Sequence, residues 1–219
     1  MAWRMAPYQS TDEGAWPSAQ GPSLFLSGPM YETYGVCTQL VSSNTETSLL
    51  LGSPSITDQS GGMFGGPRAT RILPVGSLTL GTHFHGDFYG ICSTNGTPNL
   101  RMRLGIVGGS VAATTFNQLC DNAALALVAA AAGSFFHVWF HSVVTAIGPG
   151  ATGSISSIIG YEQGTTAAGS SVRNVAPASL SLATFDLNWE YTWDIRATFS
   201  AADAANIIQL QFGQIWVMG

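Results

Sequence analysis

Residues Asn188–Ser200 read NWEYTWDIRATFS, and their polarity alternates with a period of two. In an extended strand, successive side chains point to opposite faces of the sheet. A shift of one residue would expose two tryptophans, so the pattern predicts an antiparallel sheet with one buried and one solvated face. The expected buried set is Trp189, Tyr191, Trp193, Ile195, Ala197 and Phe199.

The opposite face of this segment carries the charged residues Glu190, Asp194 and Arg196. We expect these three side chains to point outward, where a neighbouring subunit would contact them. The tryptophans could instead stack on a bound sugar, but the face that they share with other apolar groups favours core packing.

Several other segments show strand patterns. Leu78–Ser93 places Phe84, Phe88 and Cys92 on one face and polar groups on the other. Asn122–Gly133, NAALALVAAAAG, is left open between strand and helix, because alanine favours helices whereas the flanking segments are strands. Further strands are expected over residues 23–27, 34–42, 100–106, 111–115, 135–147, 154–162 and 207–218, with loops over 53–67 and 164–181.

Strands joined by polar turns, without βαβ alternation, predict an all-β fold. We expect an antiparallel two-sheet sandwich, jelly-roll-like, over residues 23–219 as a single domain. Residues 1–22, punctuated by prolines and glycines, are expected to form an extended N-terminal arm. Trp3, Tyr8 and Trp16 on this arm could anchor in a neighbour's groove, or the arm could fold back on its own domain.

Composition favours assembly. Only 9% of the 219 residues are charged, although 46% are hydrophobic, and a soluble monomer has about 25% charged residues. Much of the exterior is therefore expected to be covered by copies of the chain or by other subunits. All seven basic residues are arginines and the formal net charge is -5, which argues against a protein that neutralises nucleic-acid phosphates.

The cysteines and the most apolar stretch exclude other classes of site. Cys37, Cys92 and Cys120 have no CxxC spacing, so we expect buried free thiols and no cofactor. Residues 123–147 are interrupted by Gly133, His137 and other polar groups, so no membrane span is expected. The first residues lack a secretory-type apolar core, which predicts synthesis in a cytoplasm.

The four histidines occur in two pairs, His83 with His85 and His137 with His141. Each spacing puts a pair on one strand face, so the pairs are candidate metal ligands, and Asp87 shares the first face. The HxH resembles cupin metal sites, but only His83 and His85 match, since the following glutamate and the second cupin motif are missing. We therefore expect no metal and no enzyme activity, and interpret the histidines as residues of a polar sheet face or a subunit contact.

Arg101 and Arg103 are the only close pair of basic residues. On one strand face they could bind carboxylates of a partner, or they could belong to a solvated face.

The order of strands and turns resembles the β-sandwich structural proteins of tailed bacteriophages over about residues 72–218. The segments are NLRMRLGIVGGSVAATT (Asn99–Thr115), FFHVWFHSVVTAIGPGATGSISSIIGYEQ (Phe135–Gln163) and WEYTWDIRATFSAADAANIIQLQFGQIWVMG (Trp189–Gly219). They follow the family's succession of an Arg-bearing strand, a long central strand, a glycine hairpin, a variable loop and an amphipathic strand.

This resemblance implies a virion protein with a jelly-roll body and no catalytic residue. We therefore expect a homo-oligomer, a trimer, that binds the major capsid protein as a capsid decoration or cement protein, assembled in the host cytoplasm. The alternative is a receptor-binding head of a tail fibre or spike that recognises carbohydrate through residues 53–67 and 164–181. A cupin-like metal-dependent enzyme is the third alternative.

Overall fold

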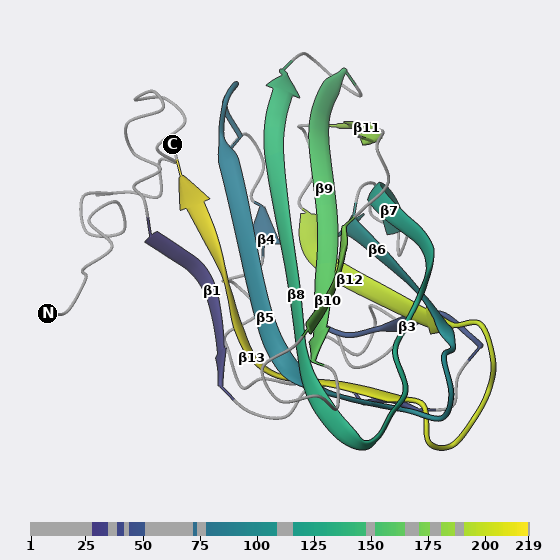
Figure 1. Cartoon of the computed structure of the whole chain (residues 1–219). Helices are drawn as coiled ribbons and strands as arrows, with labels where there is room; N and C mark the ends of the chain where they lie inside the picture. Colours follow the sequence, from purple (N-terminus) through teal and green to yellow (C-terminus); the bar gives the residue numbers. More distant parts are fainter. Residues whose placement is uncertain are drawn as a thin grey trace, which may run out of the picture.

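The computed structural model describes residues 28–34, 39–41, 44–50, 72–73, 78–108, 116–147, 152–164, 171–175, 181–186 and 191–218. The predicted arm, the strands over 23–27 and 111–115, and the loop over 53–67 lie outside these residues. The described part of the chain contains strands and no helix, and the strands form two antiparallel sheets (Figure 1). The predicted all-β sandwich is therefore confirmed.

The larger sheet has eight strands: β1-β13-β5-β8-β9-β10 lie in this order, β2 also pairs with β13, and β11 also pairs with β9. Their bounds are β1 (Gly28–Tyr34), β2 (Gln39–Val41), β5 (His83–Thr94), β8 (Ala130–Ala146), β9 (Gly153–Gly164), β10 (Ser171–Val175), β11 (Ser181–Phe185) and β13 (Ile207–Met218).

The smaller sheet has five strands in the order β3-β12-β6-β7, with β4 also paired to β12. Their bounds are β3 (Thr47–Ser48), β4 (Ile72–Leu73), β6 (Asn99–Gly108), β7 (Phe116–Ala126) and β12 (Tyr191–Phe199). In both sheets strands that are far apart in the sequence pair with each other, β5 with β13 and β6 with β12.

The core lies between the two sheets and is rich in aromatic rings. Its largest fully buried side chains include Trp193, Tyr161, Phe84, Phe140 and Phe199. The Trp193 ring lies 5.1 Å from that of Phe84 and 5.2 Å from that of Phe140, so β12 is joined to β5 and β8 across the sandwich. Aromatic pairs at such distances stabilise a core beyond the area that they bury.

Alternation correctly predicted which face of two strands is buried. In β5, Phe84, Phe88 and Cys92 are buried, whereas the polar side chains between them are partly exposed. In β12, the predicted apolar set is buried from Tyr191 to Phe199, and Trp189 lies outside the described residues.

Three predicted element boundaries differ from the structure. Segment 122–133, for which the sequence allowed either strand or helix, contains no helix. Its first residues belong to β7 and its last to β8. The predicted loop 164–181 contains β10, which pairs with the edge of β9. The predicted strand 34–42 is replaced by the end of β1 and by β2, with residues 35–38 outside the described part.

Candidate functional site

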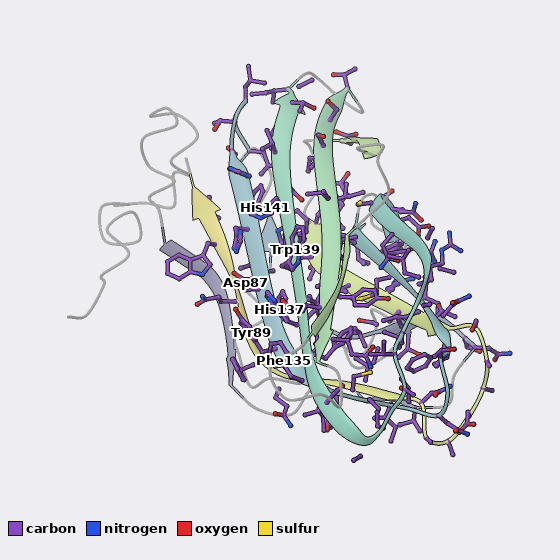
Figure 2. The ribbon with its side chains drawn as sticks, viewed as in Figure 1. Asp87, Tyr89, Phe135, His137, Trp139 and His141 are labelled. Atoms are coloured by element: carbon purple, nitrogen blue, oxygen red, sulfur yellow. The ribbon has the colours of Figure 1, made fainter. Side chains whose placement is uncertain are left out.

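The outer face of the larger sheet carries all four histidines and several aromatic rings. Cross-strand register sets them in rows: His85 lies opposite His141, Asp87 opposite Trp139, and Tyr89 opposite both His137 and Phe212. Figure 2 shows the labelled members of this face along β5 and β8, from Phe135 near the bottom to His141 near the top. We call this set of residues the histidine–aromatic face.

Asp87 joins two of the histidines. His137 Nε2 donates to Asp87 Oδ1 at 2.9 Å, and His85 Nε2 donates to Asp87 Oδ2. Because an ionised carboxylate only accepts hydrogen bonds, each of these Nε2 atoms carries its proton. Burial raises the pKa of Asp87, but the hydrogen bonds from the two histidines outweigh burial and hold that pKa below its ordinary value. The carboxylate is therefore ionised at neutral pH.

His85 also contacts His141, so a continuous polar chain crosses two strands. The two Nδ1 atoms are 3.1 Å apart, and the rings meet edge to face with their centroids 4.3 Å apart. The pKa of His141 is lowered mainly by burial, and also by the charges of His85 and His83. At neutral pH His141 is thus a neutral imidazole.

A stack of rings lies beside this chain. The Tyr89 and His137 rings are nearly parallel, with centroids 4.4 Å apart and an interplanar angle of 3°, and the Phe212 ring stacks on Tyr89 at 5.1 Å. Rings from neighbouring strands that stack in this way stand up from the sheet. Tyr89 lies between the other two rings, so His137 and Phe212 cover its faces.

One end of the face exposes apolar surface. Phe212 is 50% exposed, Phe135 48% and Ile91 43%, and all three adjoin Tyr89 or its row. Large apolar side chains that are exposed as a group mark an interaction surface more often than single ones do. We call Tyr89, Ile91, Phe135 and Phe212 the aromatic end.

The outer face of the smaller sheet is different, because its charges are paired with one another. Arg101 donates to Asp121 at 3.0 and 3.1 Å, and Arg103 forms an ion pair with Glu46 and donates to Gln118 at 3.0 Å. The prediction that the two arginines serve a partner therefore receives no support from their contacts, since carboxylates of the same chain already hold them.

The prediction that Asp194 contacts a neighbouring subunit is wrong. Asp194 lies on the outer face of β12, as expected, but it is fully buried, so it is not available for contact with a neighbour. Ser48 of β3 donates to it at 2.6 Å and Arg196 at 2.9 Å. Arg196 is itself mostly covered and lies over the Phe116 ring at 4.2 Å. Glu190 and the arm residues Trp3, Tyr8 and Trp16 lie outside the described residues.

The described thiols are structural. Cys92 and Cys120 are free and buried, as predicted, whereas Cys37 lies outside the described part. Burial raises the pKa of the Cys92 thiol to about 12, so it stays protonated and is a poor nucleophile.

Two classes of feature are not found in the described part of the chain. No three His, Cys, Asp or Glu side chains there form a group that could hold a metal ion. The same residues include no helix of sufficient length and apolarity to span a membrane.

Comparison of the chain with protein-family models, with curated proteins and with solved structures gave no match. The function must therefore be argued from the two sheet faces.

The sequence placed each histidine pair on one strand face, with Asp87 beside the first pair, but it did not predict the contact between the pairs. Pairing by spacing joined His83 to His85 and His137 to His141, whereas the closest contact is between His85 and His141 on different strands. Phe212, Phe135 and Trp139 were not singled out, since bulky residues on both faces of a strand do not reveal which face is exposed.

Proposed function

We propose that this chain is a non-enzymatic structural subunit that assembles through the histidine–aromatic face of its larger sheet. The observation that carries the proposal is the exposed aromatic end, formed by Tyr89, Ile91, Phe135 and Phe212. Covering such rings with a second copy of the chain would remove apolar area from water, at about 25 cal/mol per Å².

The distribution of charge supports the choice of face. Three arginines and three carboxylates gather on the smaller sheet and pair with one another: Arg101, Arg103, Arg196, Glu46, Asp121 and Asp194. On the histidine–aromatic face Asp87 is held by two histidines. Register also places Glu32, Glu162 and Arg173 on this face. Interface cores are enriched in aromatic residues, which fits the aromatic end of the larger sheet, where the rings of Tyr89, Phe135 and Phe212 lie together.

The resemblance to bacteriophage structural proteins suggests that the assembly is a virion. In this proposal the chain is a capsid decoration protein, a homo-oligomer expected to be a trimer, that binds the major capsid protein and stabilises the head. The 9% content of charged residues accords with a surface that is largely covered by other subunits.

Carbohydrate recognition is less well supported by this face. Stacking on a sugar needs an open ring face, but the rings of His137 and Phe212 cover the faces of Tyr89.

The first test is the oligomeric state in solution, measured by light scattering after size-exclusion chromatography. We expect a discrete oligomer for the natural chain and a folded monomer for the double variant Phe135→Ser/Phe212→Ser. Leu80→Ser is the matched control, because Leu80 is 64% exposed but lies outside the aromatic end. A natural chain that is monomeric at all concentrations, or a double variant that remains oligomeric, would contradict assembly through this face.

The second test concerns the virion. Antibodies against the chain should label the heads of phage particles produced from the genome that encodes it. Label confined to the tail would favour the receptor-binding alternative, and particles without label would contradict a virion role.

A further inference from the structure

Two imidazole nitrogens on the histidine–aromatic face are spaced as ligands of one metal ion are spaced. His85 on β5 and His141 on β8 lie directly opposite each other in register, and their Nδ1 atoms are 3.1 Å apart. Zinc–nitrogen bonds of about 2.0–2.1 Å place two ligands about 2.9–3.4 Å apart for angles between 90° and tetrahedral. The observed separation falls inside this range.

The two histidines can adopt protonation states in which both Nδ1 atoms offer a lone pair to a cation. Two Nδ1 lone pairs that faced each other at 3.1 Å would repel, so either a proton or a metal ion must lie between them. His85 keeps its proton on Nε2, where it donates a hydrogen bond to Asp87, so in the neutral ring Nδ1 carries a lone pair. His141 presents the second lone pair once its proton moves from Nδ1 to Nε2, a tautomeric change that needs no oxidant and no co-reactant.

The surroundings of His85 also match those of a metal ligand. Histidines that bind metal ions usually donate their other ring N–H to a carboxylate, which orients the ring and makes it more basic. Asp87 has this position, and its second oxygen is held by His137. The His85 side chain is 26% exposed, so an ion from solvent can reach it.

We propose that His85 Nδ1 and His141 Nδ1 chelate one divalent transition-metal ion of the class that prefers imidazole: zinc, nickel or copper. Asp87 orients His85 without touching the metal. Water fills the remaining positions, because the described part of the chain contains no group of three His, Cys, Asp or Glu side chains that could hold a metal ion. Structural zinc sites use four protein ligands, so this ion is exchangeable and is not part of the fold.

The proposal does not rest on the assembly proposed above. The pair lies one row beyond Asp87, whereas the aromatic end begins at Tyr89 on the other side of Asp87 (Figure 2). A monomeric protein could bind the metal, and an oligomeric protein could lack it.

The experiment is calorimetric titration of the full, tag-free chain with zinc, nickel and copper chlorides after treatment with EDTA. We expect one saturable site per chain in the natural protein. His85→Ala and His141→Ala should each lower the affinity at least tenfold. His137→Ala is the matched control, because His137 also donates to Asp87 but takes no part in the Nδ1 pair, and it should bind within about threefold of the natural protein. Asp87→Asn should weaken binding by about 10- to 100-fold.

A second measurement keeps the proposal testable if a variant fails to fold. Nitrogen-15 spectra of the histidine rings in the natural protein should show zinc shifting the Nδ1 signals of two histidines while the Nδ1 signal of His137 stays in place. The absence of saturable binding for all three ions would overturn the proposal. Unchanged affinity in both His85→Ala and His141→Ala, or zinc shifts centred on other rings, would also overturn it.

Discussion

The Ser48 hydroxyl donates to the carboxylate of Asp194 at 2.6 Å, although the two residues are 146 positions apart. Asp194 is fully buried and also accepts from Arg196 at 2.9 Å, while Arg196 lies 3.5 Å from Glu46. This contact ties β3 to β12 on the outer side of the smaller sheet.

Replacing Asp194 should therefore be strongly destabilising. Asp194→Ala removes the carboxylate that accepts from the Ser48 hydroxyl and from the mostly covered Arg196, and breaking a buried charged pair costs about 3–5 kcal/mol. Because Glu46 still contacts Arg196, we expect the lower end of this range in urea unfolding. Arg101→Gln is the control, since its 51% exposed side chain should contribute less than about 1 kcal/mol. Equal effects of the two substitutions would show that Asp194 is not held as described.

The second prediction concerns the pH dependence of stability. Burial raises the pKa of Asp121, but the hydrogen bonds from Arg101 and from the Ala123 amide lower it by more than burial raises it. The pKa of Asp121 in the folded protein therefore lies below the ordinary value. A lowered carboxyl pKa adds stability that is fully present above the unfolded pKa and is lost as the pH falls through the folded pKa. Asp121→Asn should cost about 1 kcal/mol at pH 7, as for a partly exposed pair.

This cost should shrink as the pH falls below about 4 and should vanish in acid, where both proteins are neutral at this position. Urea midpoints measured between pH 2.5 and pH 8 will check the shape of the curve. A cost that stayed constant down to the lowest pH would mean that the charge of Asp121 contributes nothing.

Gly86 provides a test of the core. A methyl group at this position would overlap the Phe140 ring, which lies across it from β8. Overpacking of this kind costs about 1–3 kcal/mol, so Gly86→Ala should lower the melting temperature by several degrees. Gly164→Ala is the matched control in a strand, because its new methyl would meet Phe135 atoms only at 3.5 Å or more. Adding Phe140→Leu to Gly86→Ala should restore part of the loss, and an additive further loss would refute this explanation.

A stabilising substitution is expected at Ala123. This residue has a φ of 57°, in the left-handed region, at the irregularity where β7 pairs with β6. An L-residue pays about 1–2 kcal/mol for this conformation and glycine does not, although glycine loses more entropy on folding. Ala123→Gly should therefore raise stability by about 0.5 kcal/mol or leave it unchanged. Ala124→Gly in the same strand should lower stability by about 0.5–1 kcal/mol, and the same loss at both positions would rule out strain at Ala123.

Strand alternation predicted much of the fold, because it depends only on neighbouring residues. It identified the buried residues of β5 and the apolar side of β12 correctly. The burial of Asp194 was not predictable in this way, since it results from β3, which pairs with the edge of β12 from a distant part of the chain. Alternation describes one strand and does not reveal what covers its outer side.

The candidate site was predictable as a face but not as a set of contacts. A period of two placed His83, His85, Asp87 and Tyr89 together, which the structure confirms. The contact between His85 and His141 depends on the register between β5 and β8. A shift of two residues would keep both histidines on the face and would separate them. The sequence alone does not determine that register.

The position of β13 has a consequence for how the protein folds. Residues 207–218 pair with β5 on one side and with β1 and β2 on the other, so the last described strand lies inside the larger sheet and not at its edge. A ribosome releases this strand after all the other described strands, and until then one side of β5 stays unpaired. Such distant pairing slows folding, and a nascent chain that is stalled before residue 207 would display an open β5 edge to any other unfinished copy nearby.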